Sequence, residues 1–516
     1  MTVLLVINED WYNYSKLNMS LWYLSLSLPL LPVYLTFLAC LLVYKSIIIA
    51  ILKLKHGKNL TIITSNDSLF GLGKFRENLS NVLFTMNTEM SEEALRERMV
   101  QAINMKMVKY EQHFKKIHSS LYNFMGYTFL IKEDDVRATD FVTILDVEKD
   151  RYESINHLAY EYSMKPLPKQ NKRLFEIIII KSSKEWKMRN NFKGEKIPVL
   201  MRMHHLLADG LSTLNLNVQL FGDNKVVINE VVDKFNTNRK RPQYWLEILQ
   251  NIYFFLLLPG YIIYHEIHTY GNDRGFMNNL GSGKQHFIYK VGDDNMMIQK
   301  IKNLKNKIGD CSFTQILITA ISASIYEYSK KTSKIPKSIE TVNAGVRDLK
   351  PMNKNGLPIL MNQFGYVTHE IPIDIKSESL FKRIDAIKEC METSDIVTNF
   401  MIMKTLLCYT MGLFPIYFKK LFFQTNSAIL AISNLPGIPK INFLDGIDVE
   451  EVYFFVLNRE IDIGMGISIM TYDEKIHLGL QVYESIIPSQ EDCRQILDNI
   501  FKTLNDLITE FSDENA

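Results

Sequence analysis

A run of 28 residues without a single charge, from Leu17 to Tyr44, limits what the N-terminal part of this chain can fold into. About 20 apolar residues in a helix are enough to cross the hydrocarbon core of a bilayer. The run is too long for the core of a signal peptide and lacks a clear small-residue cleavage site, which indicates an anchor that is retained. We therefore expect a transmembrane helix over about residues 17–44.

The charges that flank this run predict its orientation. Lys45, Lys53, Lys55 and Lys58 follow the run, whereas Glu9, Asp10 and Lys16 precede it. Because cytoplasmic flanks carry the excess of lysine, a single-pass anchor with the main body in the cytosol is expected. Pro29 and Pro32 lie within the run and leave one alternative open, a hairpin that enters only one leaflet.

The rest of the chain has the composition of a folded enzyme or binding protein rather than of a disordered one. The sequence has 516 residues, of which 47% are apolar and 22% charged, so it is long enough for two domains with cores of their own. A formal net charge of +2 gives no general attraction to nucleic acid. The five cysteines are widely separated and form no metal-ligand spacing, so a reducing compartment without a zinc site is expected.

Residue patterns divide the chain into four parts. Residues 1–58 hold the anchor, 61–221 form a first half, 222–285 a linker, and 286–512 a second half. In the first half, residues 173–181 and 196–203 read as neighbouring buried strands, the second leading into a helix. The linker contains an apolar segment, 252–264, that is too short to span a bilayer but suits a monotopic membrane contact or a buried helix.

A compact motif follows the second of these strands: His204-His205-Leu-Leu-Ala-Asp209-Gly210. Adjacent side chains on a strand point to opposite faces, so only one of the two histidines can face a given pocket. A neutral imidazole is available at cytosolic pH, which suits a general base. Asp209 either orients that imidazole or holds the loop through a buried salt bridge, and Gly210 permits a sharp turn into the helix.

The motif has two other interpretations. Two histidines beside a core strand are often plain packing residues, but the combination with Asp209 and Gly210 favours catalysis. Metal binding is disfavoured because adjacent side chains diverge and no third ligand lies nearby in sequence. The chain also has no Gly-x-Ser-x-Gly element, so transfer without a covalent enzyme intermediate is the simpler mechanism.

The motif resembles that of the wax ester synthase/diacylglycerol acyltransferase family, within the CoA-dependent acyltransferases. Pro166-Leu167, Leu174-Phe175-Glu176, the segment "VNAGVRDL...MNQFGYVTHEIPI" and Ser433-Asn434-Leu-Pro436-Gly437 are similar to further elements of that family. The resemblance covers roughly residues 61–512. Thr314-Gln315 departs from an Asn-Asp pair of bacterial members, and Phe175 replaces a tryptophan, which puts the acceptor preference in doubt.

The resemblance implies an α/β fold of two chloramphenicol-acetyltransferase-like halves around a central tunnel, in addition to the N-terminal transmembrane helix. It implies that His205 is the general base, that His204 faces away, and that Asp209 is structural and pairs with Arg347. Asn434, Ser433 or nearby backbone amides are expected to stabilise the oxyanion.

The resemblance also implies the reaction. We expect long-chain acyl transfer from acyl-CoA to a fatty alcohol or diacylglycerol, with acyl-CoA as a co-substrate, no cofactor, no metal and no nucleic acid. The expected location is the membrane of the endoplasmic reticulum or a lipid droplet, with membrane lipid as a partner. Two alternatives are acylation of a small alcohol or amine and an inactive lipid-binding scaffold.

Overall fold

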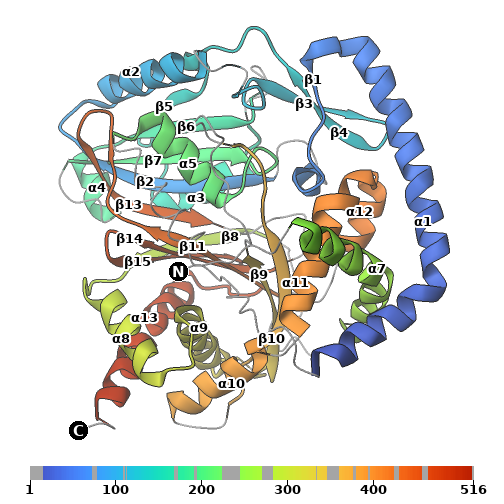
Figure 1. Cartoon of the computed structure of the whole chain (residues 1–516). Helices are drawn as coiled ribbons and strands as arrows, with labels where there is room; N and C mark the ends of the chain where they lie inside the picture. Colours follow the sequence, from blue (N-terminus) through green and yellow to red (C-terminus); the bar gives the residue numbers. More distant parts are fainter. Residues whose placement is uncertain are drawn as a thin grey trace.

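The computed structural model places most of the chain. The residues it describes are 15–71, 78–108, 111, 113–167, 173–190, 195–223, 244–269, 283–332, 334–345, 359–375, 379–392, 395–423, 429–455 and 463–513. The molecule is built on two six-stranded sheets flanked by helices, and one long helix arches around the edge of both (Figure 1).

The first sheet carries the histidine motif. Its strand order is β12 (Asn442–Phe443), β13 (Ile447–Phe455), β2 (Leu79–Asn87), β7 (Lys196–His204), β6 (Phe175–Lys181) and β5 (Val142–Asp146). The helices that belong to this part are α2 (Glu92–Ile103), α3 (Ile155–Met164), α4 (Lys184–Arg189) and α5 (Gly210–Phe221). The two strands expected at 173–181 and 196–203 are confirmed as β6 and β7, which pair antiparallel at the centre of the sheet.

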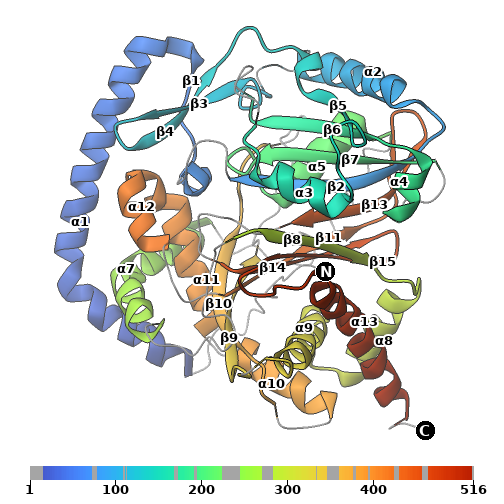
Figure 2. The ribbon, with the colours of Figure 1, turned by 180° about the vertical axis from the view of Figure 1, so that it is seen from behind.

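The second sheet lies beside the first and faces a helical layer of its own (Figure 2). Its strand order is β10 (Gly365–Pro372), β9 (Ser338–Gly345), β11 (Leu430–Ile438), β14 (Met465–Tyr472), β15 (Lys475–Tyr483) and β8 (Gln285–Val291). Its helices are α8 (Met297–Ile308), α9 (Phe313–Ser329), α10 (Leu380–Glu392) and α13 (Gln490–Asp513). A capping box opens α9, where Ser312 and Gln315 satisfy each other's backbone amides.

Two strands from late in the chain complete the first sheet. β13 pairs antiparallel with β2, and β12 pairs with β13, so residues 442–455 belong to the sheet of the opposite half. The two halves of the chain therefore exchange structure, and a cut at the linker does not separate two complete sheets. The mixed α/β architecture of two sheets flanked by helices agrees with the expected fold class.

Helix α1 (Ser15–His56) packs against the body through one face and leaves the other exposed. Buried side chains recur along it at Tyr23, Leu38, Leu41, Ile48 and Leu52. It passes α7 (Tyr244–Thr269), α11 (Asp395–Thr405), α12 (Ile416–Phe423) and a three-stranded sheet of β1 (Leu60–Thr61), β4 (Tyr127–Lys132) and β3 (Ser119–Phe124). By length and composition, α1 and α7 are both apolar enough to cross a membrane.

The crossing of α1 and α7 is close enough to require a glycine. The amide of Gly260 donates a 2.8 Å hydrogen bond to Ser27 Oγ, and a Cβ atom at Gly260 would lie 2.0 Å from the carbonyl oxygen of Tyr23. The rings of Tyr261 and Tyr264 also contact the ring of Tyr23. The apolar segment at 252–264 is therefore part of a longer helix that packs on the anchor.

Candidate active site

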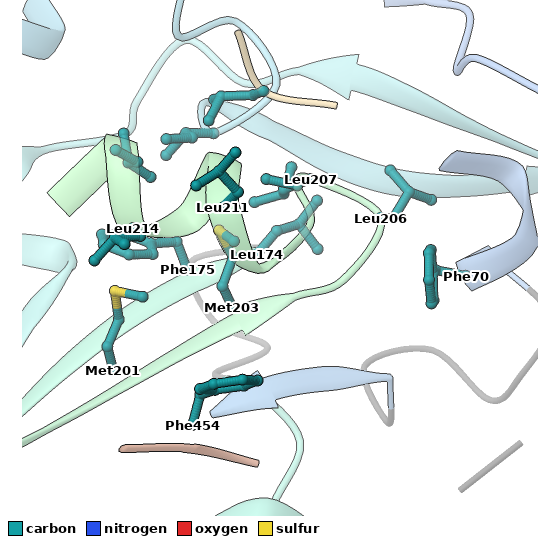
Figure 3. Packing of buried hydrophobic residues seen from close by; sticks show 14 of the residues in the cluster. Phe70, Leu174, Phe175, Met201, Met203, Leu206, Leu207, Leu211, Leu214 and Phe454 are labelled. Atoms are coloured by element: carbon teal, nitrogen blue, oxygen red, sulfur yellow. The ribbon is translucent and has the colours of Figure 1, made fainter. Parts of the chain in front are cut away.

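His205 stands in the turn between β7 and α5. The turn is held by apolar side chains on both of its sides: Leu206 and Leu207 are fully buried, and Met203 lies beneath Leu211 and Leu214 of α5 (Figure 3). Phe70 faces the same turn from η2 (Asp67–Gly71), a short 3-10 helix. Because the turn is packed on both sides, the direction of the His205 ring is fixed by its surroundings.

The imidazole of His205 has one aromatic neighbour on its face and one polar neighbour at its edge. The ring of Phe70 stacks on it with centroids 3.7 Å apart. Its Nδ1 atom lies 3.1 Å from Oδ1 of Asn362. The amide nitrogen of Asn362 donates to the carbonyl oxygen of His205 at 2.9 Å and to Oδ1 of Asp67 at 2.9 Å.

These contacts determine which nitrogen of His205 carries the proton. Two acceptors surround the amide nitrogen of Asn362, so its carbonyl oxygen must be the atom that faces the imidazole. A carbonyl oxygen only accepts, so Nδ1 of His205 carries the hydrogen and Nε2 keeps a free lone pair. This is the tautomer that a general base requires.

Asp67 and Lys116 hold Asn362 in turn. Asp67 is fully buried, and its Oδ1 accepts hydrogen bonds from both the backbone and the side-chain nitrogen of Asn362. Lys116 bonds the other carboxylate oxygen at 2.7 Å and the carbonyl of Leu360 at 2.6 Å. A chain of charge-assisted bonds thus connects Lys116 to the imidazole of His205. No pattern in the sequence around His205 predicts this chain of bonds.

Burial lowers the pKa of His205 to about 4. The hydrogen bond that His205 donates to Asn362 and the charge of Asp67 act in the opposite direction but do not compensate for the loss of hydration. The imidazole is therefore neutral, and able to accept a proton, at any pH above about 5.

Asp209 does not bond to His205. Its Oδ1 accepts the amide of Ser212 at 2.9 Å and caps the start of α5, while its Oδ2 accepts the amide of Gln363 at 2.9 Å. It therefore ties α5 to the segment that carries Asn362, and burial raises its pKa. Of the two roles left open, this geometry favours loop-holding over a triad. Arg347 lies outside the described residues, so its pairing with Asp209 remains a prediction.

The other motif residues have packing roles in the structure. His204 is buried, and its Nδ1 accepts the amide of Leu206. Gly210 does not adopt the left-handed backbone conformation; a Cβ atom there would lie 3.2 Å from the side chain of Leu435 in β11. A small residue is thus favoured by the approach of β11 to α5 rather than by the sharpness of the turn.

Ser433 and Asn434 lie on opposite faces of β11. Leu435 packs on the cluster that contains the histidine turn, and Ser433 shares its face by strand alternation. Ile432 belongs to the core of the second half, and Asn434 is buried on that face. For oxyanion stabilisation, this arrangement favours Ser433 or a backbone amide over the side chain of Asn434.

The departure at Thr314-Gln315 has a structural counterpart. Gln315 accepts the backbone amide of Ser312 at 2.6 Å and so completes the cap of α9. Its side-chain carbonyl oxygen is committed to that cap.

No metal site is found in the described part of the chain, where no group of three histidine, cysteine, aspartate or glutamate side chains could hold a metal ion.

The comparisons with known proteins identify the C-terminal part. Residues 360–507 match the model of the WS/DGAT C-terminal domain. This segment carries a WS/DGAT C-terminal domain. The resemblance to the wax ester synthase/diacylglycerol acyltransferase family is thereby confirmed for the segment that begins at Leu360, two residues before Asn362. No curated protein matches the sequence significantly.

Solved structures share the fold over nearly the whole chain. The wax ester synthase/diacylglycerol acyltransferase of Marinobacter aquaeolei VT8 superposes with a TM-score of 0.56 at 13% identity, covering 87% of this chain and 99% of the bacterial one. The TRI3 trichothecene 15-O-acetyltransferase of Fusarium sporotrichioides gives 0.57 at 12%, covering 86% and 95%. The first condensation domain of the calcium-dependent antibiotic synthetase gives 0.55 at 9%, covering 87% and 96%. At these identities the likeness concerns the fold.

Proposed function

We propose that this protein is a membrane-bound O-acyltransferase that moves a long-chain acyl group from acyl-CoA to a fatty alcohol or diacylglycerol. The observation that carries the proposal is the tautomer of His205, whose Nε2 is left free by the bond between Nδ1 and Asn362. The WS/DGAT domain at 360–507 supports acyl transfer as the class of reaction. Acyl-CoA is a co-substrate, and no cofactor is required.

In the proposed step, Nε2 of His205 takes the proton from the acceptor hydroxyl as its oxygen attacks the thioester carbonyl. The tetrahedral intermediate then collapses, the carbon–sulfur bond breaks, and the imidazolium returns its proton to the leaving thiolate. The products are an ester and free CoA, and His205 ends neutral as it began. Asn362 holds the imidazole throughout, and Ser433 or a backbone amide stabilises the oxyanion.

The surface of α1 supports the choice of a lipid acceptor. The exposed face of α1 is apolar over most of its length, and long-chain alcohols and diacylglycerol reside in the bilayer. We therefore propose attachment to the endoplasmic reticulum or a lipid droplet, with the catalytic body facing the cytosol.

The test compares the two adjacent histidines. His205→Ala should lower ester synthesis in microsomes by about 10² to 10⁴-fold, the usual value of a general base, in a protein that still unfolds cooperatively. His204→Ala should instead lower stability, because it removes a buried acceptor from the amide of Leu206. Unchanged synthesis by the His205 variant would refute the mechanism.

The acceptor is identified by competition. Microsomes receive labelled palmitoyl-CoA with hexadecanol, diacylglycerol or a short alcohol, and the labelled products are separated. A labelled wax ester or triacylglycerol is the expected result. A product only with the short alcohol would assign a small-molecule acyltransferase, and thermal stabilisation by acyl-CoA without any product would indicate an inactive scaffold.

A further inference from the structure

One face of α1 is apolar and uncovered from end to end. Its exposed apolar side chains, named here the outer face, are Leu21, Trp22, Leu28, Val33, Leu35, Leu42, Val43, Ile47, Ile51 and Leu54. The helix contains no aspartate or glutamate. An exposed apolar surface of this length requires a covering partner in water.

The opposite face of α1 contacts the body at both of its ends. Near the N-terminal end, the hydroxyl of Tyr23 donates to Asn399 of α11, a helix that packs on β10. Near the C-terminal end, Leu52 packs with Tyr127 and Phe129 of β4. A helix of 42 residues measures about 63 Å along its axis, twice the hydrocarbon thickness of about 30 Å. A spanning helix would need one end beyond the bilayer, away from the body.

The course of α7 is a second, independent argument against a helix that spans the bilayer. It runs antiparallel to α1, since Tyr261 meets Tyr23 and Phe255 meets Tyr34. The chain comes to α7 from the first sheet and leaves it for β8 of the second sheet. If α7 crossed the bilayer, the chain would have to cross back before it reached β8. The sequence between α7 and β8 contains Asp273 and Arg274, which hydrocarbon excludes.

We infer that α1 and α7 lie within a single leaflet, with the outer face in lipid and the N-terminus on the same side as the catalytic body. The inference rests on the proposed membrane attachment and is independent of the acyl transfer. It replaces the single-pass topology expected from the sequence. Helices arranged in this way form a monotopic attachment.

The occupant of the outer face is one leaflet of a phospholipid bilayer with anionic headgroups. Lys53, Lys55 and Lys58 are exposed at the C-terminal end of the apolar run, where they meet negative headgroups. Trp22 of α1 and Trp245 of α7 are both exposed, as amphipathic rings are at a membrane boundary. A second copy with its α1 parallel to this one would bring these lysines together without a counter-charge.

Topology is tested on the full chain in microsomes. An N-terminal extension with a glycosylation sequon and a C-terminal epitope are added, and protease is applied from the cytosolic side. The inference predicts an extension that is neither glycosylated nor protected, with both ends digested. A glycosylated extension in a protease-protected fragment would establish a single pass and overturn the inference, whatever the activity of the enzyme.

Vesicle binding tests whether lipid covers the outer face, with substitutions at two residues whose side chains are equally exposed. Val33 of the outer face and Met188 of α4 both have 71% of their surface exposed. Val33→Glu should weaken co-flotation with phosphatidylcholine/phosphatidylserine vesicles about tenfold, whereas Met188→Glu should leave it unchanged. Unchanged flotation of Val33→Glu, with loss of a dimer in detergent, would show that a second copy covers the face and would overturn the inference.

Discussion

Lys419 of α12 is a buried cation whose removal should stabilise the protein. The residue is 4% exposed, and its Nζ donates one hydrogen bond, at 3.1 Å, to the carbonyl of Ser68. No carboxylate pairs with it among the residues that the structure describes. Burial, together with the nearby charge of Lys45, lowers its pKa from 10.5 to about 7.

This pKa determines the cost of the charge. At about 1.4 kcal/mol per pKa unit, the protonated form destabilises the fold by about 4 to 5 kcal/mol. The unfolded chain binds this proton up to pH 10.5 and the folded chain only up to about 7, so stability rises with pH between these values. The penalty is complete below pH 7 and absent above 10.5.

We therefore expect Lys419→Met to stabilise the protein below pH 7. The methionine keeps most of the volume and forfeits one hydrogen bond of about 1 kcal/mol, which leaves a gain of about 3 kcal/mol. With an unfolding entropy of about 2.1 cal/mol/K per residue, the midpoint of thermal unfolding should rise by about 3 °C at pH 6. The gain should disappear by pH 10.

The assay is thermal unfolding in detergent across this pH range, with the neighbouring Lys420→Met as control. Lys420 is exposed on the same helix, so its replacement should change little at any pH. A Lys419 variant that is less stable at every pH, or whose gain does not depend on pH, would refute the assignment of a buried charge.

Three further predictions concern the site and its support. Asp209→Asn turns an amide hydrogen toward a backbone donor and should lower both activity and the free energy of unfolding, the latter by about 1–3 kcal/mol; a variant that melts like wild type would contradict its structural role. Asp67→Asn weakens the hydrogen bonds that hold Asn362 beside His205 and should lower kcat about tenfold with little change in KM; a change in KM alone would argue against a positioning role for Asp67. Glu176→Gln leaves the buried guanidinium of Arg202 without its counter-charge and should cost about 3–5 kcal/mol in denaturant unfolding, whereas Glu176→Leu with Arg202→Met should recover most of this; an equal loss in both would show that the ion pair is itself stabilising.

The sequence predicted the local parts of the site because local patterns specify them. A short β-branched run bounded by polar residues predicts a buried strand, and β6 is buried at six of its seven positions. The capping box of Ser312 and Gln315 is a pattern of the same local kind, because both partners lie within four residues of each other. The position of His205 at the exit of β7 follows from the same kind of reasoning.

The support of His205 was not predictable in this way. Asn362 is 157 positions from His205, and Asp67 is 295 positions from Asn362. Alternation and capping rules describe neighbours in sequence and do not relate residues that are so far apart in the chain. The only available signal was the "MNQFGY" segment, whose asparagine the resemblance noted without a role.

The course of α1 was equally hidden. Its apolar run has no polar side, so periodicity could not distinguish a face that packs on the body from one that meets lipid. The tertiary contacts of α1, from Tyr23 near one end to Leu52 near the other, reveal that the body accompanies the helix. Length and composition therefore predicted an apolar helix correctly and could not predict its direction relative to the membrane.

The pairing of β13 with β2 has a consequence for synthesis on the ribosome. Until residues 447–455 emerge, β2 is an open edge strand next to the strand that leads to His205, and its backbone groups can pair with any other extended chain. The nascent protein thus carries an unfinished sheet for most of its translation. Truncation before residue 447 should yield an aggregating product rather than an isolated catalytic half.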